Sequence, residues 1–180
     1  ENSEGWIIKG FIAQDGELKR ELLGYSVMGF ESDLVHISKD YKNAVIGVGQ
    51  IGLSNTRQII LKRLKPHNLL FPSIKSKFSY VSKHSQIGEG TTIGHGAIIN
   101  SNVKIGNHCI INSASLIEHD SIIGDFCHIS TGTILNGNVH IGKGSFIGSG
   151  AIIREGITIP ENSIVSAGKR IMGWPPIDQK

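Results

Sequence analysis

Aliphatic residues recur along the second half of the chain with an unbroken period of six. In most units a small side chain stands two positions before the aliphatic one, and glycine often follows it, as at Gly88 and Gly148. Two inward positions two residues apart match the alternation of a β-strand, and glycine allows a tight corner after each strand. The pattern therefore predicts short strands joined by tight corners. The aliphatic positions are Val81, Ile87, Ile93, Ile99, Ile105, Ile111, Ile117, Ile123, Ile129, Leu135, Ile141, Ile147, Ile153, Ile159, Val165 and Ile171.

Such hexapeptide units predict a mainly β architecture, a parallel β-helix. With six residues per side and three sides, one coil takes 18 residues, so residues 73–180 are expected to form about five coils. One coil separates Cys109 from Cys127. We therefore expect both to lie on one interior column as buried free thiols.

Residues 1–72 carry no such repeat and predict a small α/β domain, Rossmann-like and incomplete on its N-terminal side. Strands are expected at Trp6–Ala13 and Ala44–Val48, with a turn at Gly24. A helix capped by Ser54 is expected to run through Leu64. Two strands and one helix make a thin sheet.

Composition narrows the classes of function. The formal net charge of +3 is too small and too scattered for a nucleic-acid surface. No apolar run approaches the roughly 20 residues that span a bilayer, and no signal peptide is visible. The two cysteines fit a reducing compartment. We therefore expect a cytoplasmic protein with no nucleic-acid or membrane partner.

The segment Gly47–Gly52 matches G-x-G-x-x-G between a predicted strand and a predicted helix. The acidic residue that dinucleotide sites need about 20 positions later is missing. A plain glycine-rich turn is the favoured interpretation. The alternative is that the amides near Gly47 and Gly49 contact the phosphate of a nucleotide sugar.

Several histidines fall at corners or outward positions of the repeat, where a solvated ring is the ordinary interpretation. A zinc site shared between subunits is the alternative. No H-x-x-x-H spacing supports zinc, and no metal is expected. These histidines are His84, His95, His108 and His140.

Glu118-His119-Asp120 is the cluster with the most chemical potential. His119 stands two residues past the inward Ile117, so it is expected at a corner. Carboxylates beside the ring would raise its basicity, and such a histidine can take a proton from an attacking amine or hydroxyl. An exposed charged corner without function is the alternative.

His128 follows His119 by nine residues, which is half a coil. On a triangular prism this spacing places the two rings on opposite sides of one chain. They can share a site only across a subunit boundary. The spacing therefore predicts an oligomer with active sites at its interfaces.

Residues 111–142 read INSASLIEHDSIIGDFCHISTGTILNGNVHIG. This segment resembles the bacterial sialic acid O-acetyltransferases and UDP-4-amino-sugar N-acetyltransferases, which include bacillosamine-pathway enzymes. The resemblance runs from about Trp6 to Pro176. It implies a left-handed β-helix, a homotrimer and acetyl-CoA as cosubstrate.

The resemblance also assigns roles to residues of the β-helix. His119 matches the catalytic base and Asp120 its acidic partner, with Glu118 in the same motif. His128 matches a contact to the acetyl group of acetyl-CoA, and Asn112 an asparagine near the acceptor.

Further cofactor-binding residues follow from the same resemblance. Gly137 and Asn138 match a G-N-V turn beside the cofactor, and Gly148 is counted with them. Gly173 begins GWPP, which resembles a closing segment that lies along CoA. Pro176 stands where alanine is usual in that segment.

At the N-terminal side the resemblance covers GFIAQDGELKRELLGYSVMG. Members normally begin with a strand, a glycine-rich loop and a helix that help to hold the nucleotide sugar, and an aspartate after the G-F-[IL] strand binds uridine. The first three are absent from this sequence. Asp15 stands one or two places later than that aspartate, and we expect it to take that role in substrate binding.

The leading hypothesis is acetyl transfer from acetyl-CoA to an amino group of a nucleotide-linked amino sugar in bacterial surface glycan biosynthesis. His119 would deprotonate the amine, while His128 and a backbone amide near Gly137 would hold the thioester carbonyl. One alternative is O-acetylation of a sialic-acid-like sugar. Another, from a different class, is a zinc-dependent hydratase or a non-catalytic scaffold.

Overall fold

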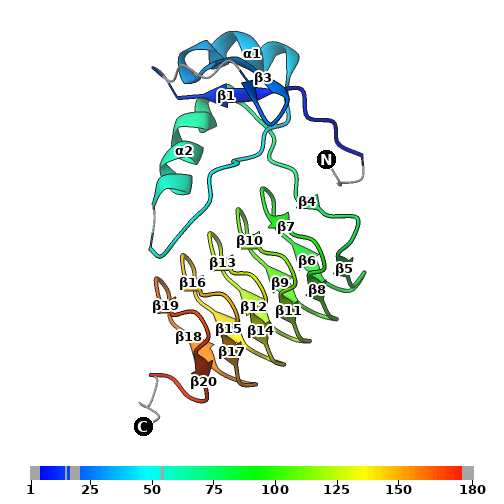
Figure 1. The fold of residues 1–180 in the computed structure, drawn as a ribbon, viewed down its shortest axis with the longest axis vertical. Helices are drawn as coiled ribbons and strands as arrows, with labels where there is room; N and C mark the ends of the chain where they lie inside the picture. The colour runs from blue at the N-terminus through cyan, green and yellow to red at the C-terminus, as the bar shows by residue number, and fades with distance from the viewer. Residues whose placement is uncertain (1–4, 15, 17–20, 54, 176–180) are drawn as a thin grey trace.

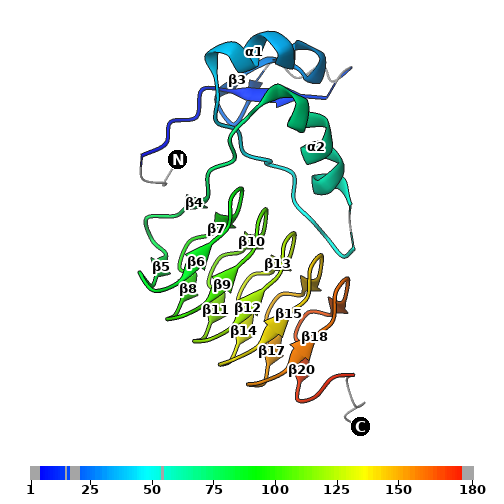
Figure 2. The ribbon, with the colours of Figure 1, turned by 180° about the vertical axis from the view of Figure 1, so that it is seen from behind.

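The computed structural model describes residues 5–14, 16, 21–53 and 55–175. A left-handed parallel β-helix forms a prism, and a small α/β region covers one of its ends (Figure 1). The C-terminal end of the described chain lies at the opposite end of the prism from that region (Figures 1 and 2).

The β-helix consists of short parallel strands that pair with the strand 18 residues further along. Its strands are β4 Ile74–Lys75, β5 Tyr80–Val81, β6 Gln86–Ile87, β7 Thr92–Ile93, β8 Ile98–Ile99, β9 Lys104–Ile105, β10 Ile110–Ile111, β11 Leu116–Ile117, β12 Ile122–Ile123, β13 His128–Ile129, β14 Ile134–Leu135, β15 His140–Ile141, β16 Phe146–Ile147, β17 Ile152–Ile153, β18 Thr158–Ile159, β19 Ile164–Val165 and β20 Arg170–Ile171. They form three sheets in the orders β19-β16-β13-β10-β7-β4, β20-β17-β14-β11-β8-β5 and β18-β15-β12-β9-β6.

The predicted inward positions form the core. Each aliphatic residue of the period is the second residue of a strand, and from Ile93 onward all are buried. The residues two positions earlier are buried as well from Thr91 to Ile157, Cys109 and Cys127 among them. The predicted fold, its register and its two interior thiols are confirmed.

The β-helix begins one side earlier than the sequence pattern indicates. Strand β4 pairs with β7 in the same 18-residue register as the later strands. Its second residue is Lys75, which is exposed at the end of the prism. Because a lysine interrupts the aliphatic series there, the period alone missed this strand.

The N-terminal region contains a three-stranded sheet and two short α-helices. The predicted strand at Trp6–Ala13 is regular only over its last three residues, and β3 and α1 were not predicted. The elements are β1 Phe11–Ala13, β2 Glu21–Leu22, β3 Tyr25–Phe30, η1 Glu31–Asp33, α1 Leu34–Asp40, α2 Thr56–Leu64 and η2 Lys65–His67.

The strand predicted at Ala44–Val48 is wrong, because this segment belongs to a loop. Apart from a bridge between Asn43 and Leu70, it pairs with no strand among the described residues. The carbonyls of Ile46 and Val48 accept hydrogen bonds from a helical side chain instead of a neighbouring strand. The loop runs along the flank of the β-helix, and α2 then leads back toward the N-terminal sheet (Figure 1).

Helix α2 ends at Leu64 as predicted, and Asn55 precedes its first residue. Ser54, the predicted cap, lies outside the described residues. Within the described part of the chain, no helix has the length and apolar character needed to cross a membrane.

Candidate active site

His119 lies at an exposed corner between β11 and β12, as its spacing predicts. Its Nδ1 lies 2.7 Å from Oδ2 of Asp120, and its side chain is 61% exposed. An ionised carboxylate only accepts hydrogen bonds, so Nδ1–H is the donor and Nε2 keeps a free lone pair. Asp120 itself adopts a left-handed turn conformation with a φ of 62°. The corner therefore holds a histidine–carboxylate pair with one ring nitrogen available as a base.

Gly137 lies one coil further along and faces the His119 ring. A Cβ on Gly137 would lie 2.9 Å from both Cε1 and Nε2 of His119. Any residue other than glycine at position 137 would therefore push against this edge of the ring. Within the described residues the amide of Gly137 donates no hydrogen bond, so an N–H group is available beside the basic nitrogen.

Two further predicted residues border this pair. The amide of Asn138 donates to the carbonyl of His119 at 2.8 Å, which ties the next coil to the corner. Glu118 is turned away from the ring, because its Oε2 accepts from Asn100 Nδ2 at 2.8 Å. The structure therefore joins Asp120, rather than Glu118, to the base.

His128 occupies a different environment on β13. Its side chain is buried, and its Nδ1–H donates to the carbonyl of Gln50 at 2.6 Å. Phe146 packs edge-on against the ring. Burial lowers the pKa of His128, while the bond to Gln50 opposes the shift, so the neutral ring is favoured.

Asn112 completes the surroundings of His128. Its Oδ1 accepts from the amide of Ser113 at 2.8 Å, which turns its Nδ2 toward His128 Nε2 at 3.4 Å. His119 and His128 therefore form two separate clusters within one chain, on different sheets of the prism.

The loop beside His128 is held by a buried arginine of α2. Arg57 Nη1 donates to the carbonyls of Ile46 and Val48 at 2.9 and 2.7 Å, and its Nη2 donates to that of His108 at 3.4 Å. The Arg57 side chain is 2% exposed. It therefore joins the N-terminal region to the β-helix.

His108 does not have the solvated ring that was expected of it. The ring is buried between Phe71 and Phe126, with ring centroids 5.4 and 5.3 Å away. Burial lowers the pKa of His108. The expectation failed because the corner columns of the prism stack on one another, so that an aromatic corner residue is covered by its neighbours. His84 and His95 are exposed, and His140 is half-buried.

Of the remaining predicted binding residues, Gly148 and Gly173 lie in the C-terminal half of the chain, whereas Gly47 and Gly49 flank Val48 in the loop whose Gln50 carbonyl bonds to His128. Gly148 packs against the next coil, where a Cβ would lie 2.5 Å from the amide of Ala167. Gly173 and the loop glycines Gly47 and Gly49 have no neighbour within 4 Å of a Cβ position. Asp15 and Pro176 lie outside the described residues.

No group of three potential metal ligands occurs among the described residues. Cys109 Sγ donates to the carbonyl of Gly124 at 3.1 Å, and burial raises the pKa of the Cys109 thiol. This thiol is therefore a poor nucleophile and a poor metal ligand.

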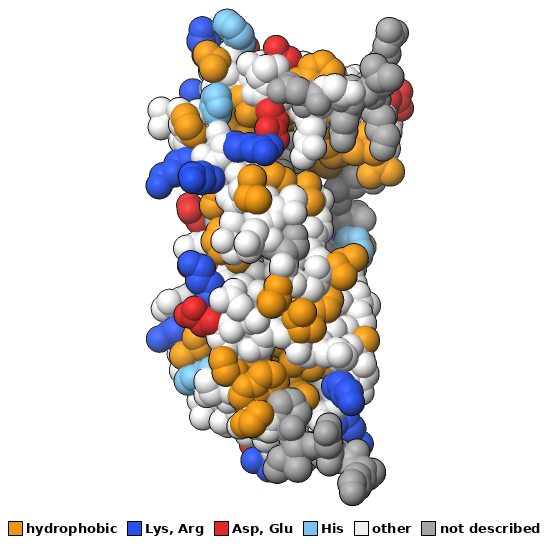
Figure 3. Space-filling model, turned by 90° about the vertical axis from the view of Figure 1, so that its left-hand side faces the viewer, with side chains coloured by type: hydrophobic (Ala, Val, Ile, Leu, Met, Phe, Trp, Pro, Cys, Tyr) orange, Lys and Arg blue, Asp and Glu red, His pale blue; other side chains and the backbone are white. Residues whose placement is uncertain are grey.

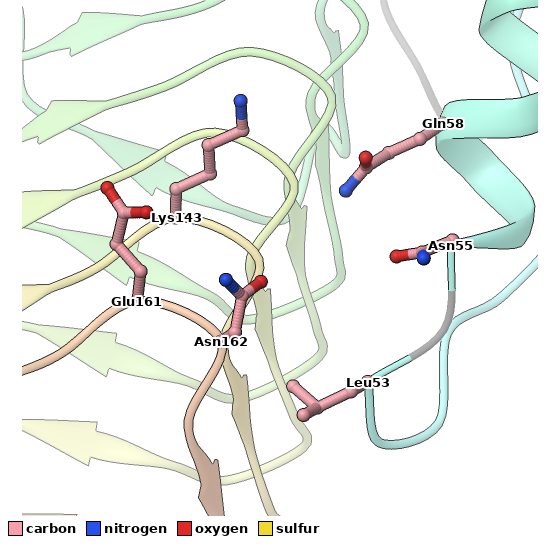
Figure 4. Close-up of a pocket in the computed structure, with 6 residues that line it drawn as sticks. All are labelled: Leu53, Asn55, Gln58, Lys143, Glu161 and Asn162. Carbon is pink, nitrogen blue, oxygen red and sulfur yellow. The ribbon is translucent and has the colours of Figure 1, made fainter.

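An open pocket of about 500 Å³ lies between the start of α2 and the turns of the β-helix. Figure 4 shows Asn55 and Gln58 facing Lys143 and Asn162 across this space. None of the predicted site residues lines it. The reactive corner at His119 is thus distinct from this pocket.

Three residues of the two clusters were missed from the sequence. Asn102 bonds to Asp120 and stands 18 residues before it, so the coil period could have identified it. Gln50 and Arg57 reach their partners only because of the way a non-repetitive loop folds. The period of the repeat gives no information about that loop.

The bacterial transferase hexapeptide family (six repeats) matches residues 84–119 and 120–155. With the observed coils, this match shows that residues 84–155 consist of transferase hexapeptide repeats. No curated protein matched the chain.

Solved structures narrow the similarity to sugar acetyltransferases. A mutant of perosamine N-acetyltransferase from Caulobacter crescentus, in complex with CoA and GDP-perosamine, is 28% identical with a TM-score of 0.80, covering 86% of this chain and 72% of the other. The acetyltransferase domain of PglB from Neisseria gonorrhoeae is 25% identical with a TM-score of 0.81, covering 91% and 78%. WeeI from Acinetobacter baumannii is 27% identical with a TM-score of 0.71, covering 93% and 84%.

Proposed function

We propose that the protein transfers the acetyl group of acetyl-CoA to an amino group on a nucleotide-linked amino sugar. The observation that carries the proposal is the His119–Asp120 pair, whose Nε2 edge lies against Gly137, a residue whose amide donates no hydrogen bond within the described residues. The neighbours solved with acetyl coenzyme A, or with CoA and GDP-perosamine, share this fold at 26–28% identity. The Caulobacter crescentus enzyme is an N-acetyltransferase, which favours an amine over a hydroxyl as the acceptor.

The proposed reaction uses two nitrogen groups at the corner, Nε2 of His119 and the backbone N–H of Gly137. The amine nitrogen attacks the thioester carbon, and His119 Nε2 takes the proton that the amine loses. Asp120 keeps Nδ1 protonated and stabilises the charged ring that results. The Gly137 N–H is placed to donate to the oxyanion that forms on the carbonyl.

Collapse of the tetrahedral intermediate breaks the carbon–sulfur bond. His119 then returns its proton to the departing thiolate, so CoA leaves as a thiol and the ring is neutral again. No covalent enzyme intermediate is needed. His128, Asn138, Gly148 and Gly173 are proposed on the CoA side, and Asn112, Asp15, Gly47 and Gly49 on the sugar side, as the sequence resemblance implies.

The outward side chains of one sheet support a homotrimer. On the sheet that contains β11 they form an apolar column from β5 to β17, with Arg170 of β20 at its end, whereas those of the β12 sheet are mainly polar. His119 follows β11 directly, so its corner borders the column. The apolar column consists of Tyr80, Ile98, Leu116, Ile134 and Ile152.

A second apolar surface accompanies the loop before α2. Val45, Val48, Ile51 and Leu53 are all exposed in the single chain. Figure 3 shows hydrophobic side chains gathered on the flank of the β-helix that faces left in Figure 1. Apolar surface of this kind favours contact with another copy of the chain. We propose that the trimer forms in a cytoplasmic setting, where both thiols stay reduced.

The test of function is acetyl transfer to a panel of acceptors. Purified protein is mixed with acetyl-CoA and with GDP- or UDP-linked amino sugars, the free amino sugars, or sialic acid, and release of the CoA thiol is followed. We expect turnover with a nucleotide-linked amino sugar and a product whose acetyl group survives mild base. A base-labile acetyl group on sialic acid would establish O-acetylation instead, and failure to bind CoA would refute both enzymatic hypotheses.

The test of the shared site is complementation between two inactive chains. Chains carrying His119→Ala and chains carrying His128→Ala are co-expressed and purified as mixed oligomers. If one site takes a ring from each of two subunits, some mixed sites contain both rings and activity returns. Mixed oligomers as inactive as either parent would contradict a shared site, and a monomer in sedimentation would contradict the trimer.

A further inference from the structure

The carboxylate of Asp120 is held from two sides. Its Oδ2 accepts from His119 Nδ1 at 2.7 Å, and its Oδ1 accepts from Asn102 Nδ2, also at 2.7 Å. Asn102 stands one coil before Asp120 in the same column of turns. One oxygen therefore serves the base and the other is fixed by an amide.

We propose that Asn102 is a positioning residue for the His119–Asp120 pair in the reaction proposed above. A carboxylate bonded through only one oxygen can rotate and let the imidazole ring turn or change tautomer. With Oδ1 fixed by Asn102, Oδ2 stays directed at Nδ1. The Nε2 lone pair then stays on the side of Gly137, where the amine would attack.

The turn itself does not need an asparagine. Asn102 has a left-handed φ of 58°, a conformation that asparagine tolerates. Corresponding turns of the β-helix hold this conformation with glycine, as at Gly96, Gly132 and Gly150. Since glycine suffices for the backbone, replacing Asn102 by glycine separates the effect of its side-chain amide from that of the turn.

Electrostatics around Asp120 agree with this geometry. The pKa of Asp120 is lowered, first by the hydrogen bond from Asn102 and second by that from His119. His119 is the only titratable group contributing to this shift among the described residues, since the Glu118 carboxylate is bonded to Asn100. A neutral donor thus keeps the carboxylate ionised without competing with the ring for its charge.

The experiment uses Asn102→Gly, which removes the side-chain amide and keeps a residue suited to the left-handed turn. Carbon-13 NMR of the Asp120 carboxyl group should show its pKa raised toward the ordinary value. Nitrogen-15 NMR should show an Nε2–H tautomer of His119 that is absent from the parent. We expect kcat to fall about 3- to 10-fold, with KM for acetyl-CoA within about 2-fold of the parent.

A second variant and a matched control separate positioning from folding. Asn102→Asp keeps the shape and the turn but sets a carboxylate against Asp120, so it should raise the pKa of Asp120 more than Asn102→Gly does. Asn162→Gly makes the same change at a turn with a φ of 54°, away from the pair, and should alter neither spectrum nor kcat.

The two NMR readouts do not depend on turnover, so they test the role of Asn102 even if the acceptor panel gives no product. An unchanged Asp120 pKa and an unchanged His119 tautomer in Asn102→Gly would overturn the proposal. Equal losses of kcat in Asn102→Gly and Asn162→Gly would also overturn it, because a general effect on the coils would then be the cause.

Discussion

His119 and His128 lie nine residues apart in the same β-helix and occupy opposite chemical situations. His119 is exposed, has a carboxylate behind Nδ1 and leaves Nε2 open. His128 is buried, donates Nδ1–H to a backbone carbonyl and has an amide near Nε2. A carboxylate can stabilise a charged ring, whereas burial favours a neutral one, and at His128 burial outweighs the opposing effect of the carbonyl. The comparison is consistent with the proposed roles, in which His119 transfers the proton and His128 contacts the acetyl group of acetyl-CoA.

The two sites also depend on different parts of the chain. The groups that shape the His119 corner, Asn102, Asp120 and Gly137, come from neighbouring coils of the repeat. The His128 site includes the carbonyl of Gln50, in a loop that Arg57 holds from α2. The first site should therefore tolerate changes in the N-terminal region, and the second should not.

Replacement of His119 is the most direct test of this comparison between the two histidines. His119→Asn removes the base from an exposed position, so kcat should fall about 10²- to 10⁴-fold. The free energy of unfolding should change by no more than about 0.5 kcal/mol. Steady-state kinetics and urea unfolding measure the two quantities. If His128→Asn abolished turnover while His119→Asn kept it, the assignment of the base would be wrong.

Removal of Arg57 tests the dependence of the second site on the loop. Arg57→Met leaves the buried carbonyls of Ile46 and Val48 without their donor, so the free energy of unfolding should fall by about 2–4 kcal/mol. Arg63→Met is the matched control on the same helix. Arg63 is exposed and paired with Glu31 at 3.3 Å, and such a pair contributes at most about 1 kcal/mol. Equal losses in the two variants would show that the loop does not rely on Arg57.

The β-helix was predictable from its period because each inward position is repeated and stacked on an equivalent one. Lys75 shows the limit of that logic, since a strand whose inward residue lies at the open end of the prism can carry any side chain. The N-terminal region was predicted less well. Ala44–Val48 has the apolar character of a strand, but its carbonyls bond to Arg57, and that contact depends on tertiary structure.

For the site, spacing placed His119 at a corner and His128 on another side of the prism. Spacing could not distinguish an exposed ring from a buried one, because the cover over His128 comes from Gln50, 78 residues away in sequence. His108 was misjudged partly for the same reason, since Phe71 precedes the repeat and covers the ring only in the folded chain. Phe126, by contrast, stands 18 residues after His108, so the coil period could have placed it beside the ring. Asn102 was predictable in principle from the 18-residue coil.

Gly137 provides a smaller perturbation of the His119 corner. In Gly137→Ala the new methyl group meets the edge of the His119 ring, so kcat should fall about 10-fold. Gly137 has no left-handed φ, and stability should hardly change. Gly96→Ala makes the opposite test, since its φ of 66° disfavours alanine. It should cost about 1 kcal/mol of stability and spare kcat. If Gly137→Ala lost stability instead of kcat, or if Gly96→Ala lost kcat to the same extent, the proposed fit between Gly137 and His119 would be contradicted.

The smallest expected effect is the pH dependence of stability that comes from His128. Burial lowers its pKa in the folded state, so the unfolded chain binds a proton first as the pH falls through about 6.5. The stability linked to a neutral His128 is therefore present above that pH and is lost below it, by at most about 1.4 kcal/mol per pH unit.

Urea unfolding at a series of pH values between about 7.5 and 5 measures this slope. His128→Gln keeps a polar side chain that does not titrate, and it should remove the contribution of His128 while His108 still supplies its own, because burial lowers the pKa of His108 as well. A slope unchanged by His128→Gln would mean that His128 takes up protons equally in the folded and unfolded chains. The contrast with His119 would then rest on geometry alone.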